Sequence, residues 1–433
     1  MLIQFSVSNF KSIKDEAVLS LVSGSSNKMG NTVFVDNLDI LPSAVLYGAN
    51  ASGKSALIEA FAMMRDIVLN KNRIMLSTDE LPANPFLLST ETENAATVFD
   101  IIFESSGKRY KYGFEYDIGC VYSEYLYVYE SVRPTCVFDF DVDEESKISE
   151  RYKELKRIKG KNKNFLFLWL ADQIGNECAN EVLHWFKECS VIRSNRVNEN
   201  LMPGLRKAMG DEMKRAKIIE LMKSADFGIE DVKLGSATLP WTSLPLEVRE
   251  RLKRMRTIND TVELKKMSFD SVHTQYDGKN SPVQKIPFDM ERDESFGTKS
   301  YFYLSASILN ALGNGSLLVI DELDLSLHPL LSQKIVELFN NPQVNKNHAQ
   351  LVFTTQDTNL LTKKNFHKSQ VWFTEKDKYG ATHLTSLIEY KNIDSKADYN
   401  QCYIMGKYGA IPYLGMFDFI EEKFDLGGTD GEK

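Results

Sequence analysis

The feature that most constrains this chain is a glycine-bounded loop at residues 48–55, with the sequence Gly-Ala-Asn-Ala-Ser-Gly-Lys-Ser. It matches the pattern G-x-x-x-x-G-K-[ST]. The apolar run Ala44-Val45-Leu46-Tyr47 precedes the loop, and apolar residues recur every three or four positions from Lys54 to Leu69. The first pattern predicts a buried strand and the second an amphipathic helix. A loop between a strand and a helix is the context in which this motif holds phosphate groups.

Each part of the motif has a chemical role toward a nucleoside triphosphate. The glycines allow backbone amides to surround phosphate oxygens, and the start of the helix adds positive potential. Lys54 can neutralise the β and γ phosphates, and Ser55 can ligate Mg²⁺. We therefore predict ATP and Mg²⁺ as cofactors, with Asn50, Gly53, Lys54 and Ser55 in the binding site.

A pair of acidic residues follows a second predicted strand. The continuous apolar run Leu317–Ile320 is typical of a parallel strand covered on both faces, and Asp321-Glu322 come directly after it. In phosphate-loop enzymes the first carboxylate holds Mg²⁺ and a following glutamate polarises the attacking water. Two exposed acids at a strand end are the alternative. Together with the loop, the pair predicts a metal-binding Asp321 and a catalytic Glu322.

The chain divides into three regions by pattern and charge. Residues 1–145 are strand-rich, with alternating apolar residues near Leu2–Val7 and a hairpin expected within Thr97–Val132. Residues 146–290 are expected to form a helical, basic insertion, since residues 146–270 hold 25 basic and 18 acidic residues. Residues 291–433 return to a β/α pattern, with a further strand at Leu351-Val352-Phe353.

Two stretches of the insertion are especially basic. Lys147–Lys163 carries eight basic and two acidic residues, and Arg249–Lys266 carries seven and three. A solvated helix face and a groove that follows a phosphate backbone both explain such stretches. The sequence leaves both readings open, so nucleic acid remains a candidate partner at the basic insertion.

Several segments together resemble the ABC-class ATPases of the SMC/RecF-like group. They occur in the same order and cover most of the chain: Asn9–Ser12, Gly48–Ser55, Glu294–Thr298, Asp321–Pro329, Phe353–Asp357, Gln370–Lys376 and Gly406–Pro412. The chain is most similar to the "AAA family ATPase" proteins of prokaryotic restriction and phage-defence loci, of the OLD, RloA and PtuA type. The resemblance implies an α/β fold: an ABC-type P-loop ATPase head, with an N-terminal mixed or antiparallel β part and a helical insertion.

The resemblance also implies a site that one subunit cannot complete. In that class, the signature segment of one protomer caps the γ-phosphate held by the loop of another. Carried over, Ser295, Gly297 and Thr298 would act in trans, so the protein would be at least a dimer. Their hydroxyls and backbone amide can donate to phosphate oxygens.

Other nucleotide-site residues also follow from the resemblance. Lys11, in the Asn9–Ser12 segment, would join the nucleotide-binding residues, and Asp324 and His328 would belong to the interface loop beside the catalytic glutamate. Gln356 stands where the family usually has a histidine that contacts the γ-phosphate. A glutamine amide still donates a hydrogen bond but carries no titratable positive charge, so we expect slow hydrolysis.

Two expected absences narrow the function. The basic segment at 146–270 has no sustained heptad pattern, which disfavours tethering through a long coiled coil. Little sequence remains beyond Pro412, and neither a D-x-D motif nor an H-N-H constellation is evident. We therefore expect no fused nuclease, and any nuclease or toxin effector would be a separate polypeptide.

These observations lead to three hypotheses. The preferred one is an oligomeric ATPase that senses a trigger and controls a separate effector in anti-phage defence. The alternatives are a DNA-binding ATPase of repair or recombination and a nucleotide-gated scaffold with little hydrolysis.

The longest apolar run, Phe165–Ala171, is too short to span a membrane, and the five cysteines form no C-x-x-C pair. A cytoplasmic protein with no membrane partner is expected.

Overall fold

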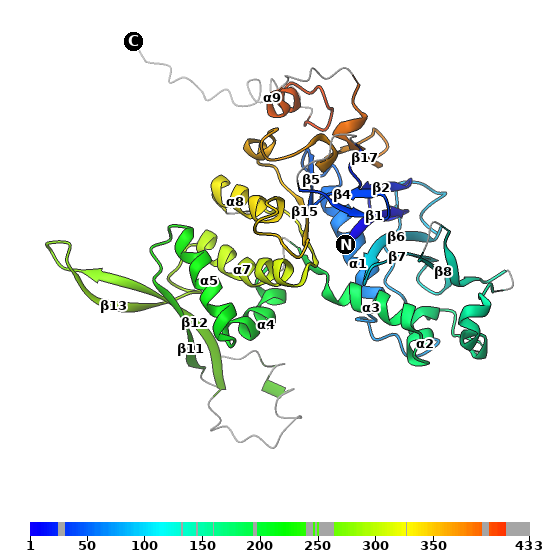
Figure 1. Ribbon diagram of the computed structural model, residues 1–433, viewed down its shortest axis with the longest axis horizontal. Coiled ribbons are helices and arrows are strands. Elements are labelled where there is room, and N and C mark those ends of the chain that lie inside the picture. The colour runs from blue at the N-terminus through cyan, green and yellow to red at the C-terminus, as the bar shows by residue number, and fades with distance from the viewer. Residues whose placement is uncertain are drawn as a thin grey trace, which may run out of the picture.

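The described chain forms two six-stranded sheets, a three-stranded sheet that lies apart from them (Figure 1) and a two-stranded ribbon. The α/β class predicted from the sequence is confirmed. The computed structural model describes residues 1–24, 31–130, 133–143, 146–158, 160–193, 197–239, 246, 249–250, 264–325, 327–391 and 398–412.

The first six-stranded sheet is mainly parallel and positions the site. Its order is β10 (Ser190–Ile192), β14 (Leu317–Ile320), β15 (Gln350–Thr354), β5 (Ser43–Gly48), β16 (Val371–Lys376) and β17 (Thr382–Ser386). The first five strands are parallel, and β17 pairs antiparallel with β16. Because parallel strands end at the same edge, the loops that follow β5, β14 and β15 meet there.

Both faces of this sheet are covered, which explains its continuous apolar runs. Along β5, Ala44 and Leu46 pack in one core, whereas Val45 and Tyr47 pack in the other. Helix α1 (Lys54–Val68) belongs to the first core and lies between the two large sheets. Helices α7 (Phe296–Asn314) and α8 (Pro329–Asn340) contribute to the second core.

The second six-stranded sheet is antiparallel. Its order is β2 (Ala17–Ser20), β1 (Leu2–Ser8), β6 (Thr97–Ser105), β7 (Lys108–Tyr116), β8 (Val121–Tyr129) and β9 (Thr135–Asp141). The hairpin expected within Thr97–Val132 is therefore part of a four-strand meander that β1 and β2 extend. The ribbon consists of β3 (Val33–Val35) and β4 (Leu38–Ile40).

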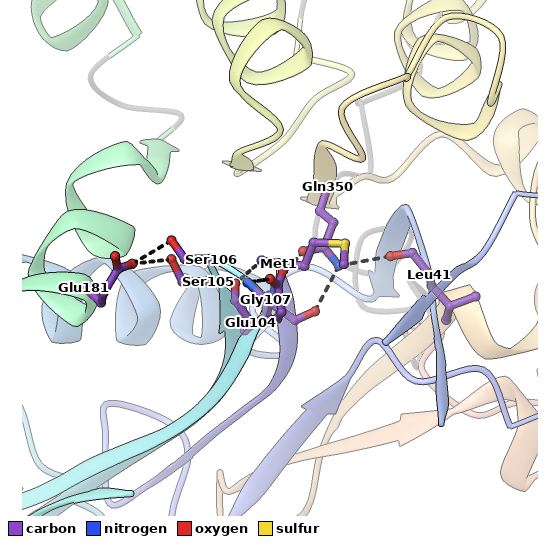
Figure 2. A network of polar contacts seen from close by, with 9 residues as sticks. Met1, Leu41, Glu104, Ser105, Ser106, Gly107, Glu181 and Gln350 are labelled. Carbon is purple, nitrogen blue, oxygen red and sulfur yellow. Dashed lines mark hydrogen bonds and ion pairs between the residues drawn. The ribbon is translucent and has the colours of Figure 1, made fainter. Parts of the chain in front are cut away.

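A buried glutamine joins the two large sheets (Figure 2). Gln350 begins β15, and its amide nitrogen donates to the carbonyls of Leu2 at 2.9 Å and Leu41 at 3.1 Å. Its side-chain oxygen accepts from the Leu2 backbone amide. On the other side of β6, Ser105 donates to Glu181 on α3 (Glu177–Glu188) at 2.9 Å. These contacts fix the start of the antiparallel sheet against the parallel one.

The segment 146–290 differs from the helical insertion that the sequence predicts. It contains helices: the 3-10 helix η1 (Glu150–Arg157), α2 (Phe167–Gln173), α3, α4 (Val197–Met209) and α5 (Glu212–Ser224). It also contains β11 (Asp231–Leu239), β12 (Leu264–Tyr276) and β13 (Pro282–Asp289), an antiparallel sheet that reaches away from the centre (Figure 1).

β13 gives one reason for this difference. Most of its residues are exposed, so it lacks the alternation of buried apolar residues that marks a half-buried strand. Within the same segment, β10 joins the main parallel sheet. The unit boundaries near residues 145 and 290 remain a proposal.

Part of the basic charge of this segment is used within the chain. Arg151 forms an ion pair with Glu130, and Lys156 forms one with Glu150. Lys161 is largely desolvated and donates to a backbone carbonyl at 2.9 Å. Of the second basic stretch, residues 251–263 lie outside the described residues.

The remaining elements follow the parallel sheet. Three short 3-10 helices and one α-helix complete the described chain: η4 (Thr358–Leu360), η5 (Lys368–Gln370), η6 (Leu387–Glu389) and α9 (Tyr399–Ile404). No helix within the described ranges has the length and apolar character needed to cross a membrane.

Candidate nucleotide site

The loop between β5 and α1 makes a tight turn that requires glycine. Gly53 has a φ of +108°, a region that side chains rarely adopt. A Cβ atom on Gly53 would lie 2.1 Å from Thr382 Oγ1. The loop is thus pressed against β17, and no larger residue fits at this position.

The first turn of α1 is open to an anion. Gly53 is the N-cap residue of α1, and no side chain accepts a hydrogen bond from the first amides of this helix. By contrast, Ser295 caps α7 and His328 caps α8. The amides of Lys54 and Ser55 belong to the first helical turn and have no intrahelical acceptor. These amides together with the helix dipole suit a phosphate group.

Lys54 is buried and satisfied by its own loop. Its Nζ donates to the carbonyls of Gly48 at 2.7 Å and Ala49 at 3.1 Å. Burial lowers the pKa of Lys54, and the charges of Asp321, Glu322 and Asp324 oppose this shift. The lysine therefore lies in the same electrostatic environment as the acidic residues after β14, as a phosphate-binding cation should.

The loop after β5 and the acidic residues after β14 make direct contact. Ser55 Oγ donates to Asp321 Oδ1 at 3.1 Å. Thr354, at the end of β15, donates to the same Oδ1 at 2.8 Å and accepts from the Glu322 amide at 2.7 Å. Three neighbouring strands thus each contribute one polar group, as the parallel topology dictates.

Glu322 has an unusual backbone conformation. Its φ is +57°, the left-handed region, which costs a non-glycine residue roughly 1 kcal/mol. The Glu322 amide bond to Thr354 and the Leu325 amide bond to the Glu322 carbonyl at 2.9 Å hold it there. Strain of this kind is common at functional sites. Its side chain is half-buried, so water can reach it.

The residues present fit Mg²⁺ bound together with a nucleotide. Ser55 and Asp321 could supply two oxygen ligands, and Mg²⁺ usually completes its shell with water and substrate phosphates. Within the described ranges, no group of three or more His, Cys, Asp or Glu side chains forms an all-protein metal cage. A Mg²⁺ ion held by two protein oxygens, substrate phosphates and water needs no such cage.

A second layer of hydroxyls supports the loop. Thr382 Oγ1 donates to the Ser52 carbonyl at 3.0 Å, and it lies within hydrogen-bond distance, 2.8 Å, of the Ser12 hydroxyl, which can donate to it. Ser52 and Thr374 hydroxyls are 2.6 Å apart. The Asn9–Ser12 segment therefore reaches the phosphate loop through Ser12. Thr354 and Thr374 lie in the family-like segments Phe353–Asp357 and Gln370–Lys376 but were given no role in the site from the sequence, and Thr382 lies in none of those segments.

Lys11, by contrast, lies beside α1. It forms an ion pair with Glu59, one turn beyond Ser55, and burial together with the charge of Arg193 lowers the pKa of Lys11. Asn50 is exposed at the top of the loop, where its side chain faces solvent. Both residues remain candidates for contact with a nucleotide.

The residues after β14 and β15 form one surface. The backbone N–H of Gln356 donates to Asp324 Oδ2 at 3.2 Å, and the Gln356 side chain is exposed. His328 is exposed at the start of α8, where its Nδ1 accepts from the Leu330 amide at 3.3 Å. The chain thus places Asp324, His328 and Gln356 where a second chain can reach them.

The signature residues lie at the start of α7. Ser295 Oγ accepts from the Thr298 amide at 3.1 Å, and the two hydroxyls are 2.8 Å apart. Ser295 is exposed, Gly297 is half-buried and Thr298 is buried. Among the described residues, no hydrogen bond joins Ser295, Gly297 or Thr298 to the phosphate loop. The preceding Glu294 accepts from Ser271 on β12 and contacts His273 there at 2.7 Å.

The comparisons with solved structures show distant likeness. An SMC head domain from Thermotoga maritima is 12% identical over 89% of this chain and 98% of its own, with a TM-score of 0.40. An SMC head bound to the C-terminal winged-helix domain of ScpA is 11% identical over 89% and 97%, with a TM-score of 0.43. No curated protein matches the chain.

A family model covers the site. It matches residues 43–362, a range that includes β5, the phosphate loop, the signature segment, Asp321, Glu322 and Gln356. Its description reads "AAA domain, putative AbiEii toxin, Type IV TA system". Since the match spans well over half of the chain, this protein belongs to that family.

Proposed function

We propose that the protein binds and hydrolyses ATP with Mg²⁺ and acts as a dimer or higher oligomer. The observation that carries the proposal is the meeting of Lys54, Ser55, Asp321 and Glu322 at one edge of the parallel sheet. When a nucleotide binds, the Lys54 ammonium group would donate its hydrogen bonds to phosphate oxygens instead of to the carbonyls of Gly48 and Ala49. Ser55 and Asp321 would hold Mg²⁺, which neutralises phosphate charge. Glu322 would accept a proton from the attacking water.

The dimer part of the proposal rests on the signature segment. Ser295 is exposed, and its hydroxyl is held at the N-terminus of a 19-residue helix. That position suits a γ-phosphate, because a helix N-terminus and a hydroxyl donor both favour an anion. Since the segment makes no described contact with its own loop, we place it on the nucleotide of a second protomer.

Replacing Glu322 with Gln tests both parts. The variant should bind ATP, lose at least 100-fold in hydrolysis rate and elute at twice its nucleotide-free mass in ATP. Glu220→Gln on the exposed face of α5 is the matched control and should behave like the parent. A Glu322→Gln protein that keeps its nucleotide-free size in saturating ATP contradicts the dimer, and one that hydrolyses normally contradicts the catalytic assignment.

Within this proposal, the ATP-bound oligomer controls a separate effector, a nuclease or toxin, in anti-phage defence. The family description and the resemblance support this part. The test is to co-purify partners from the native host with the Glu322→Gln variant and then to challenge cells with phage. Loss of protection in Lys54→Ala cells supports the role. Equal plaque counts with and without the gene contradict it.

The repair alternative rests on the basic segment at 146–270. Neutralising Lys156, Arg157, Arg251 and Arg254 should then weaken binding to duplex DNA. The number of counterions released on binding, measured from the salt dependence of the affinity, should fall by about four. Arg251 and Arg254 lie outside the described residues. Unchanged DNA affinity in the quadruple variant excludes this groove.

The scaffold alternative rests on Gln356, whose side chain can donate a hydrogen bond but lacks the titratable positive charge of the histidine that the resembled family usually has there. An ATP-dependent dimer with no measurable phosphate release from the parent protein would favour it. Steady hydrolysis that Glu322→Gln abolishes would exclude it.

A further inference from the structure

A second basic cavity lies away from the phosphate loop. It has a volume of about 810 Å³ and opens between α1, α3 and β10 on one side and α4, α5 and α7 on the other. Its described lining includes seven basic and two acidic side chains. None of residues 48–55, 295–298 or 321–324 lines it, so it is distinct from the candidate nucleotide site.

Four lysines from three helices converge on this cavity. They are Lys187 on α3, Lys207 on α4, and Lys214 and Lys217 on α5. All four are exposed, and none forms an ion pair with a residue in the described ranges. Like charges gathered around a concavity repel one another and raise the local positive potential. An anion in the cavity would relieve that repulsion.

The wall formed by α1, α3 and β10 carries further positive charge beside Lys187. The Asp66 carboxylate forms ion pairs with three cationic side chains: Lys71 at 2.7 Å, Arg193 at 3.1 Å and Arg65 at 3.7 Å. The other acidic residue of the lining, Glu188, accepts from a neutral amide, that of Asn314. Cationic groups thus face the cavity from both walls and outnumber the carboxylates of the lining.

The shape and lining restrict the class of ligand. The volume lies within the roughly 300–1,000 Å³ that is usual for small-molecule sites. The described lining contains no aromatic side chain on which successive bases could stack, and its uncharged part combines aliphatic side chains with serine and asparagine side chains. Lysine ammonium groups suit phosphates as point charges. A double helix is too wide to enter a cavity of this size.

We propose that this cavity binds a small molecule that carries several phosphate groups, separate from the ATP at the phosphate loop. Lys207, Lys214 and Lys217 would hold phosphates on one wall, with Arg193 on the other. The site is connected to the first through shared elements: α1 carries Ser55 on its first turn and Arg65 on its last, and the Ile192 carbonyl accepts the Asp321 amide at 2.9 Å.

The test uses inorganic tripolyphosphate and the full chain with Lys54→Ala, which removes the phosphate-loop lysine. Calorimetry in low salt should detect tripolyphosphate binding to this parent. Adding K207Q, K214Q and K217Q should weaken binding at least tenfold. The matched control adds K279Q, K346Q and K364Q, which remove the same charge from exposed lysines outside the cavity, and should stay within twofold.

Three results would overturn the proposal. They are absence of tripolyphosphate binding in the Lys54→Ala parent, equal binding with and without the cavity lysines, and equal weakening by both triple variants. A single-stranded octanucleotide that binds where tripolyphosphate does not would assign the cavity to a nucleic-acid strand and reject the small molecule. With Lys54 intact, the cavity variant should keep its ATP affinity and its melting temperature, which shows that the fold is preserved.

Discussion

Ser55 and Asp321 are 266 positions apart in the chain, yet the Ser55 hydroxyl donates to a carboxylate oxygen of Asp321 at 3.1 Å. The contact exists because β5 and β14 are parallel, with β15 between them. Both side chains follow the carboxyl end of their strand, so both reach the same edge. The contact places the two groups that would hold Mg²⁺ next to each other.

Thr354 should prove as important as the acidic residues that it positions. Thr354→Val keeps the shape but removes the donor to Asp321 and the acceptor for the Glu322 amide. The partly buried Glu322 amide is left unpaired, so we expect a loss of about 1 kcal/mol in stability. ATP hydrolysis should fall at least tenfold, because Glu322 loses its support. Denaturant unfolding and phosphate release measure the two effects.

Thr354→Ser is the control for that change, since it retains the hydroxyl. It should recover most of the hydrolysis rate. A Val variant with parental turnover would show that the position of Glu322 does not depend on this hydroxyl.

The close approach at Gly53 can be separated from its backbone conformation. Gly53→Ala adds a Cβ atom 2.1 Å from Thr382 Oγ1 at a φ of +108°. Gly107→Ala adds one at a φ of +77° with nothing within 4 Å. The second change should cost about 1 kcal/mol from backbone strain alone. The first should cost clearly more and abolish ATP binding. Equal melting temperatures for the two variants would contradict the contact with β17.

Ser295 should have two separable roles. Ser295→Ala removes the N-cap of α7 and should cost about 1 kcal/mol of stability. Ser295→Asp keeps a capping side chain but places a negative charge where we locate the γ-phosphate. It should retain stability and lose ATP-dependent dimerisation, as measured by light scattering.

Asp211→Ala, which removes the N-cap of α5, is the matched control. It should lower stability by a similar amount and leave dimerisation unchanged. Normal ATP-dependent dimers of Ser295→Asp would remove this residue from the interface.

Lys54 should reduce the stability of the nucleotide-free protein. Burial lowers the pKa of Lys54 from its usual 10.5, so the folded state binds its proton less tightly than the unfolded chain does. The cost is fully present below the folded pKa and disappears as the pH rises toward 10.5. Lys54→Met should therefore raise Tm by about 2 °C near neutral pH, with a smaller gain in alkaline solution.

The control for this change is Lys364→Met at an exposed position, which should leave Tm unchanged at every pH. A Lys54→Met protein that melts below the parent near pH 7 would show that the bonds to Gly48 and Ala49 outweigh the burial of the charge.

The local patterns of the sequence predicted the elements of the phosphate site. β14 has the predicted bounds, Leu317–Ile320, and α1 begins at Lys54 as expected. Both are strongly specified by neighbouring residues, through a continuous apolar run and a regular apolar stripe. The hairpin near residue 100 was predicted only in part, because β1 and β6 pair across almost a hundred residues.

The sequence alone determined that a phosphate loop and an acidic pair are present, because both are short motifs whose residues carry their own chemistry. The surroundings of both motifs depend on how distant parts of the chain pack together. Thr354 and Thr382 act through contacts with residues far away in the chain, and the charge on one cavity comes from three helices whose lysines are unremarkable one by one. Such groupings depend on strand order and helix packing, which bring together residues that no local pattern connects.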